Sequence, residues 1–82
     1  MSSQTLSELV EIIAKALVDE PESVHVDTVG SGRHPRLELT VAQDDIGKVI
    51  GKDGRTAQSM RVLLNAAASK LDGGRAYLDI VD

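Results

Sequence analysis

The sequence contains no cysteine, no tryptophan and no phenylalanine, and Tyr77 is its single aromatic residue. The lack of cysteine excludes disulfides, thiolate zinc sites and cysteine nucleophiles. The lack of aromatic residues requires an aliphatic core, and it excludes a surface that stacks several bases on several rings. No apolar run is longer than three residues, so no segment is expected to cross a bilayer as a helix.

The start of the chain, Met1-Ser2-Ser3-Gln4, has neither a basic region nor an apolar region of the kind found in secretory signals. Together with the absence of cysteine, this favours a cytoplasmic location. A length of 82 residues suits one domain, which we expect to span residues 1–82 with a core at about 5–81.

The net charge of −4 hides an uneven distribution. Residues 1–45 carry nine acidic and three basic side chains, whereas residues 46–61 carry four basic side chains and one acidic one. Because salt screens charges beyond about 10 Å, the local excess decides what this segment attracts. The simpler interpretation, a solvated basic helix face, is favoured if the charges are considered alone.

The spacing of apolar residues predicts three helices. Thr5-Leu6-Ser7-Glu8 has the form of a capping box, so the first helix should start near residue 5 or 6. One stripe of it would be apolar, namely Leu6, Leu9, Val10, Ile13 and Leu17. A short helix should follow Asp44 or Asp45, either of which would cap it, and end at Gly51. A long helix should then bury the seam Ala57, Met60, Leu64, Ala67 and Leu71, and end at Gly73-Gly74.

Alternating apolar residues predict strands at 24–29, 37–41 and 76–80, the first two antiparallel across a loop at 30–35. Each strand has an apolar face and a polar face. The fold class is therefore α+β in two layers, with the order α-β-β-α-α-β and helices covering one face of a three-stranded sheet. The uncovered face carries Asp27, Glu38 and Asp79, and it should repel phosphates.

The segment from Ile46 to Arg55 holds the most informative pattern. Gly51 and Gly54, three residues apart, permit a turn with positive φ that a sugar-phosphate chain can approach closely. The turn leads into a helix whose first amides lack partners within the helix, which favours an anion there. Lys52 in the turn, Arg55 after it and Lys48 before it bring cations to the same place.

Other phosphate-binding motifs do not fit this segment. A Walker A loop needs four residues between its first glycine and a Gly-Lys pair, and a following Ser or Thr, but Gly47 and Gly51 enclose three residues and Asp53 follows Lys52. A single G-x-x-G is by default a turn between helices. The double Ile-Gly spacing, the basic residues and the two flanking helices favour a binding role.

These residues resemble the I-G-x-x-I-G-x-x-G core of the KH RNA-binding domain, and the element order resembles its type II arrangement. The length resembles the small bacterial single-KH proteins of the KhpA (YlqC) family, and the resemblance covers roughly residues 5–81. It implies a turn that clamps about four nucleotides of single-stranded RNA. It also implies a role as an RNA chaperone or post-transcriptional regulator, and a homodimer or a heterodimer with a larger KH-containing protein.

Carried onto this sequence, the resemblance places RNA contacts in the turn, the short helix before it, the start of the next helix and the variable loop. The implied residues are Ile46, Gly47, Lys48, Val49, Ile50, Gly51, Lys52, Asp53, Gly54, Arg55, Arg33 and Arg36. Two residues of this part of the chain, Asp53 in the turn and Ala57 in the helix after it, depart from the pattern of the family. Asp53 puts a carboxylate in the turn, which should weaken phosphate binding or point away from it, and Ala57 is smaller than the usual residue.

Simpler and rival interpretations remain beside this one. We expect Arg61 to be a solvated helix residue and Tyr77 a packing residue with its hydroxyl at the surface. Two histidines without a suitable spacing make a metal site improbable, and no cofactor or catalytic residue is expected. The acidic first half and Asp53 favour a rival in which the scaffold mainly dimerises with protein partners. A ribosome-associated assembly factor is a further alternative.

Overall fold

The computed structural model describes residues 2–30 and 34–81, and it has the predicted α+β fold. The helices and strands follow the predicted order: α1 (Ser2–Leu17), β1 (His25–Val29), β2 (Arg36–Thr40), α2 (Ile46–Ile50), α3 (Arg55–Asp72) and β3 (Tyr77–Val81). Short 3₁₀ turns at Pro21–Ser23, Gln43–Asp45 and Lys52–Gly54 connect some of them. No helix in the described ranges has the length and apolar character needed to cross a membrane.

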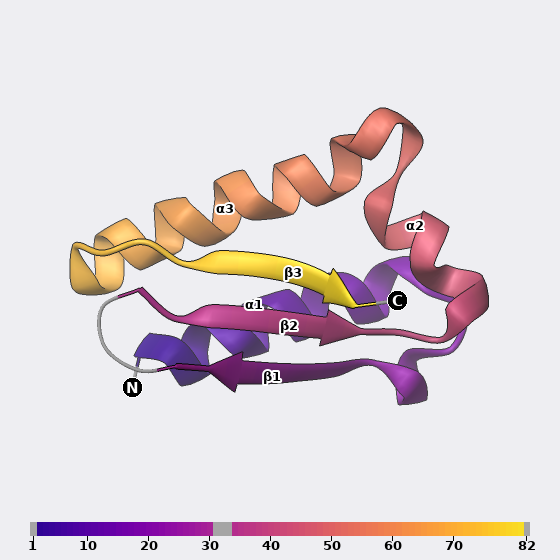
Figure 1. The fold of residues 1–82 in the computed structure, drawn as a ribbon, viewed down its shortest axis with the longest axis horizontal. Helices are drawn as coiled ribbons and strands as arrows, with labels where there is room; N and C mark the ends of the chain where they lie inside the picture. Colours follow the sequence, from indigo (N-terminus) through magenta and orange to yellow (C-terminus); the bar gives the residue numbers. More distant parts are fainter. Residues whose placement is uncertain (1, 31–33, 82) are drawn as a thin grey trace.

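The three strands form one sheet in the order β1-β2-β3. β1 and β2 pair antiparallel, as predicted, whereas β2 and β3 pair parallel because α2 and α3 form the connection between them. In Figure 1, α1 lies behind the sheet and α3 runs along the outer side of β3, so that the face nearest the viewer stays uncovered. Asp27, Glu38 and Asp79 are register partners across the three strands and form one row on that open face.

The core lies between the sheet and helices α1 and α3, and it is aliphatic as predicted. Its most deeply buried members come from all the layers: Leu6, Val10, Leu37, Leu39, Val49 and Leu64. α3 lies along β3 and packs against α1. The N-terminus of α3 and the turn before it are left projecting beyond the sheet (Figure 1).

The sequence placed three helix features wrongly. α1 begins at Ser2, so Thr5 lies inside the helix and the expected cap at residues 5–6 is not its start. Water at an exposed end can satisfy the first amides, so a helix can extend past a capping sequence. Leu17 and Leu71 are exposed, and Val18 and Ala68 are buried beside Leu17 and the partly buried Ala67. Either residue of such a neighbouring pair continues a helical stripe, and the position of the sheet decides which one is covered.

Candidate nucleic-acid interface

The turn between α2 and α3 has the backbone geometry that its glycines predict. Three of its four residues have positive φ, namely Gly51 at 78°, Asp53 at 58° and Gly54 at 74°. The amide of Gly54 donates to the carbonyl of Gly51 at 3.1 Å and closes the turn. A Cβ on Gly51 would meet the side chain of Thr56 and lie 2.9 Å from its backbone nitrogen. The turn is therefore compact, and glycine at position 51 is required for space as well as for conformation.

A buried carboxylate fixes the short helix that precedes the turn. Asp45 is 1% exposed, and its Oδ2 accepts a hydrogen bond from the amide of Glu20 at 3.1 Å. Lys48 lies 3.2 Å from Asp45 and 3.2 Å from Asp19. The prediction that Asp45 caps α2 with its side chain is wrong, because the structure shows no such cap bond. The carboxylate instead ties α2 to the segment that follows α1.

The protonation of this pair follows from its contacts. Burial alone would raise the pKa of Asp45, but hydrogen bonds from the backbone of Asp19 and Glu20 and from Lys48 outweigh burial and lower it. The pKa of Lys48 is raised by its hydrogen bonds to Asp45 and Asp19. Both groups are therefore charged at neutral pH, and the positive charge of Lys48 is already balanced by acidic neighbours.

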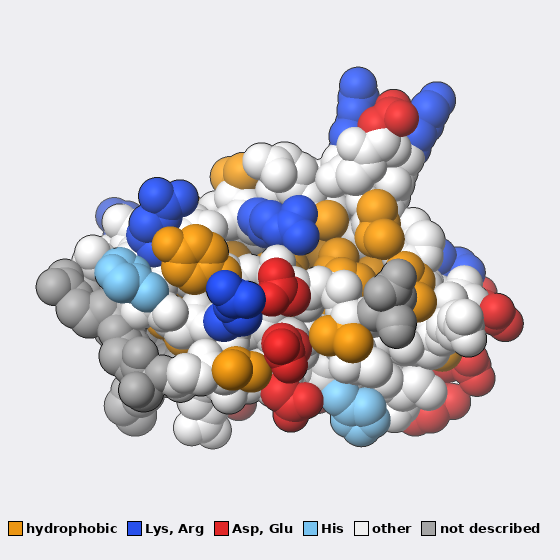
Figure 2. Space-filling view, in the orientation of Figure 1, with side chains coloured by type: hydrophobic (Ala, Val, Ile, Leu, Met, Phe, Trp, Pro, Cys, Tyr) orange, Lys and Arg blue, Asp and Glu red, His pale blue; other side chains and the backbone are white. Residues whose placement is uncertain are grey.

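The cations of the turn differ from Lys48 in this respect. Lys52 and Arg55 are exposed, and neither forms an ion pair with any residue in the described part of the chain. Gly54, the N-cap of α3, supplies no side chain to the first amides of that helix. Figure 2 shows the turn projecting from the molecule, with basic and acidic side chains at its tip. The tip combines the N-terminus of α3, the exposed cations Lys52 and Arg55, and the carboxylate of Asp53.

A groove of about 640 Å³ lies between α3 and β3. Its wall on α3 comes from residues spaced three or four apart, which share one helix face, and its opposite wall comes from the start of β3 and from β2. The lining residues are Arg36, Gln58, Arg61, Val62, Asn65, Arg75, Ala76, Tyr77, Leu78 and Asp79. Three arginines and one aspartate give this groove a net positive charge.

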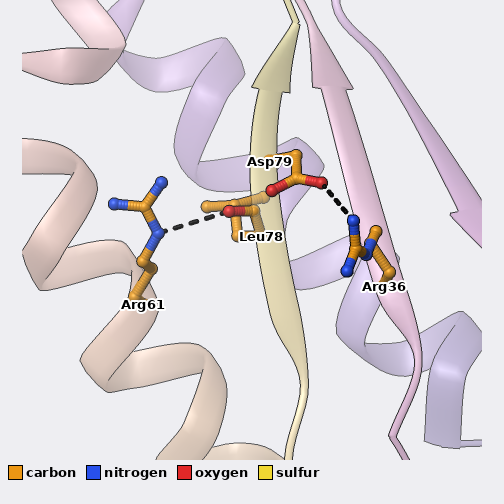
Figure 3. A network of polar contacts seen from close by, with 4 residues as sticks. All are labelled: Arg36, Arg61, Leu78 and Asp79. Carbon is orange, nitrogen blue, oxygen red and sulfur yellow. Dashed lines mark hydrogen bonds and ion pairs between the residues drawn. The ribbon is translucent and has the colours of Figure 1, made fainter.

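Polar contacts join α3 to the strand wall of the groove and also connect β2 with β3 within that wall; Figure 3 shows one contact of each kind. Arg61 Nε donates to the carbonyl oxygen of Leu78 at 3.2 Å, and Arg36 pairs with Asp79 at 3.2 Å. The amide of Ala76 donates to Asn65 Oδ1 at 3.1 Å. Arg61 is thus held by the neighbouring strand, and the prediction that it is merely solvated is wrong.

The open face of the sheet continues from the groove with the opposite charge. The row Asp27, Glu38 and Asp79 gives the red patch at the centre of Figure 2, next to the blue side chains of the groove. Only Asp79 of this row has a basic partner in the described part of the chain. The electrostatic field therefore favours a polyanion in the groove and disfavours one over the open faces of β1 and β2.

The structure distributes the sequence-predicted site residues over different environments. Gly51, Lys52, Asp53, Gly54 and Arg55 lie together at the projecting turn. In α2, Val49 is fully buried in the core, Ile46 is partly buried, and Gly47 and Ile50 are exposed. Arg36 lies in the groove, whereas Arg33 lies outside the described residues.

Sequence reasoning missed most of the groove. Val62, Asn65 and Arg75 were not identified, and Tyr77 was taken as a packing residue, whereas Gln58 lies at the start of α3, where the resemblance placed contacts. The helical spacing of residues 58, 61, 62 and 65 shows that they share a face. Which strand that face meets depends on the parallel pairing of β3 with β2, and the pattern of the sequence does not encode it.

Comparison with known proteins shows clear relatives. The family model KhpA/KhpB, KH domain, matches residues 7–80. The RNA-binding protein KhpA of Clostridium perfringens is 55% identical over 65 residues, which cover 79% of this chain and 87% of the relative. The RNA-binding protein KhpA of Caldanaerobacter subterraneus is 52% identical over 76 residues, which cover 93% of this chain and 100% of the relative.

The fold is also found in a solved structure of low sequence similarity. A crystal structure of an Aquifex aeolicus Era variant, bound to GDP and AlF4−, superposes with a TM-score of 0.69 at 21% identity. The match covers 93% of this chain and 29% of that longer one. At this level of identity the similarity concerns the fold alone.

Proposed function

This chain is a member of the KhpA/KhpB family of KH domains, and on that premise we propose that it binds single-stranded RNA through the turn Gly51–Gly54 and the groove between α3 and β3. Relatives named RNA-binding protein support the ligand class. The observation that carries the proposal is the turn itself, in which positive-φ backbone, the N-terminus of α3 and two exposed cations coincide, Lys52 and Arg55, which form no ion pair within the described residues. The binding unit comprises residues 5–81.

In this mechanism the phosphates and the bases of the RNA contact different parts of the protein. Phosphates approach the turn, where no Cβ of Gly51 or Gly54 obstructs them and the N-terminus of α3 attracts negative charge. The bases then lie along the groove, against the aliphatic part of Val62 and the polar edges of Gln58 and Asn65. The acidic row of the open sheet face keeps the strand on the side of α3.

The charge of Lys52 provides the test. Lys52→Asp keeps both glycines and lies on an exposed turn, so the fold should persist by circular dichroism. The affinity for a labelled unstructured RNA should fall roughly tenfold to a hundredfold, because a charge-assisted contact is replaced by repulsion. Lys70→Asp makes the same charge change in the last turn of α3, away from the tip, and should have little effect. An unchanged affinity of Lys52→Asp contradicts the proposal.

Salt dependence tests the phosphate contribution separately. The logarithm of the affinity should fall linearly with the logarithm of the salt concentration, by roughly 0.7 per phosphate contacted. Arg55→Ala should make this slope shallower by about 0.7, because it removes one cation, and with it one phosphate contact, from the turn. A slope near zero in the wild-type protein would mean that the tip does not hold phosphates.

We also propose, as a second function of the same chain, that it associates with itself or with another KH-containing protein. Leu63 and Leu71 on α3 are 55% and 52% exposed, and they offer apolar surface to a partner. Sedimentation of the wild-type protein and of Leu63→Glu tests this association. A monomer at all concentrations, both alone and with RNA, contradicts self-association. An RNA chaperone would in addition accelerate the annealing of complementary strands.

A further inference from the structure

The position of Tyr77 is informative because Tyr77 is the single aromatic residue of the chain. It begins β3, lines the groove and is 48% exposed. The described core is built from aliphatic residues and does not include it. A large ring that stays half exposed at the wall of a basic groove therefore offers a flat apolar face to whatever the groove holds.

Three arginines and one carboxylate line the groove with Tyr77; the carboxylate is that of Asp79, which lies two residues further along β3 on the same strand face and pairs with Arg36. Arg36 is the register partner of Tyr77 on β2, and Arg75 lies two residues before Tyr77. Arg61 reaches β3 from α3, where its Nε donates to the carbonyl of Leu78, the residue after Tyr77. The two terminal nitrogens of Arg61 have no hydrogen-bond partner among residues 2–30 and 34–81, and Figure 3 shows them directed away from that bond. The three guanidinium groups outnumber the single carboxylate, so an apolar ring in a groove of net positive charge matches a base joined to a phosphate.

The distance from the turn also fits. The contacts of Arg61 with Leu78 and of Asn65 with Ala76 lie on either side of Tyr77 and fix its level along α3. That level is six to ten residues beyond Arg55, or roughly 9–15 Å at the rise of an α-helix. A turn of this kind clamps about four nucleotides, so a strand held at the turn extends toward the ring.

We propose that Tyr77 stacks on one base of the bound single strand and forms a separate subsite at the end of the groove remote from the turn. This inference rests on the proposed function, and it adds the contact that holds the far end of the strand. Stacking on a single ring accepts any base, with purines favoured by their larger area. It differs from a platform of several aromatics, which the composition excludes.

The protein carries its own reporter for this contact. Because there is no tryptophan and only one tyrosine, its ultraviolet emission comes from Tyr77 alone. Addition of an unlabelled oligoadenylate in low salt should quench that emission along the same saturation curve as the anisotropy of a labelled oligoadenylate. Free tyrosine with the same oligonucleotide corrects for absorption by the bases.

Two substitutions separate stacking from apolar burial. Tyr77→Leu should weaken the binding of labelled oligoadenylate about tenfold, whereas Tyr77→Phe should keep nearly the wild-type affinity because the ring remains. Val29→Ala removes apolar surface from the same cross-strand row on the far strand β1 and should leave the affinity unchanged. Circular dichroism establishes that each variant is folded.

The outcomes distinguish this inference from the proposed function. If oligoadenylate binds but the emission of Tyr77 does not change, or if Tyr77→Leu binds as the wild type does, the subsite is wrong and RNA binding at the turn stands. Equal losses in Tyr77→Phe and Tyr77→Leu assign the effect to the hydroxyl and also overturn stacking. If no RNA binds the wild-type protein, both proposals fail.

Discussion

The carboxylate of Asp45 accepts a hydrogen bond from the backbone amide of Glu20 at 3.1 Å, across a separation of 25 residues. Asp45 is the one buried charged residue in the described part of the chain, and Lys48 covers it from the solvent side. The bond connects the end of the α1 segment to the beginning of α2. The orientation of α2, which leads directly into Gly51, therefore depends on Asp45, a residue outside the turn.

Removing this carboxylate should destabilise the protein. Asp45→Ala leaves the amide of Glu20 without its acceptor and Lys48 without its buried partner, so the melting temperature should fall by roughly 10 °C. Asp44→Ala is the matched control, because Asp44 is an exposed neighbour in the same 3₁₀ turn and should have little effect. Equal melting temperatures for the two variants would contradict the role assigned to Asp45.

The contribution of Asp45 should depend on pH in a defined direction. Its pKa is lowered in the folded protein, so its stabilising effect is present above the ordinary value of 3.8 and is lost as the pH falls through the folded value. Asp45→Asn keeps an oxygen for the amide of Glu20 but does not titrate. The difference in free energy of unfolding between wild type and Asp45→Asn, measured in urea, should shrink toward zero in acid below 3.8. A constant difference would exclude this titration.

Three glycines of one segment should respond differently to alanine. Gly54→Ala forces a left-handed conformation on alanine without any close contact, which should cost about 1–2 kcal/mol. Gly51→Ala should cost more, because the added Cβ also collides with Thr56. Gly47→Ala lies in α2 with no atom within 4 Å of the new Cβ, and should be neutral or stabilise by about 0.5–1 kcal/mol.

Chemical denaturation ranks the stability of these variants, and RNA affinity should fall in Gly51→Ala but not in Gly47→Ala. Gly47→Ala adds a methyl group on the exposed side of α2 and leaves the turn intact. Gly51→Ala displaces the turn, so its affinity should fall even at temperatures where it is folded. If Gly51→Ala were as stable and as active as Gly47→Ala, the described turn geometry would not be required.

Asp53 should oppose RNA binding. Its carboxylate lies among the phosphate-facing groups of the turn, and its φ of 58° is one that asparagine also tolerates. Asp53→Asn should therefore preserve the turn and raise the affinity for labelled RNA roughly twofold to threefold at low salt. Asp44→Asn removes the same charge before α2 and should have a smaller effect. A weaker affinity of Asp53→Asn would mean that the carboxylate contributes a contact of its own.

The parts of the molecule that the sequence predicts are those that local chemistry decides. Alternation of apolar residues predicts β1, β2 and β3 within one residue at each end. Gly51 and Gly73 end their helices with positive φ, as their lack of a Cβ favours. The candidate turn was located because its glycines, cations and flanking helices are contiguous.

The features that the sequence did not predict depend on residues far apart in the chain. Lys48 was expected near phosphates because it is basic and precedes the turn, but Asp19 lies close enough to pair with it. The groove joins residues 58–65 with residues 75–79 and Arg36, which only the packing of α3 along β3 brings together. The spacing of residues along α3 predicts which of them form one wall of the groove. It does not predict which strands form the opposite wall.

The contacts of α3 with β3 have a consequence for assembly. Arg61 and Asn65 occupy main-chain groups on the outer edge of β3, where a foreign strand would otherwise form its ladder. Growth of the sheet from that edge requires these side chains to be displaced first. The protein is thereby protected on this border against the edge-to-edge aggregation that threatens small open sheets.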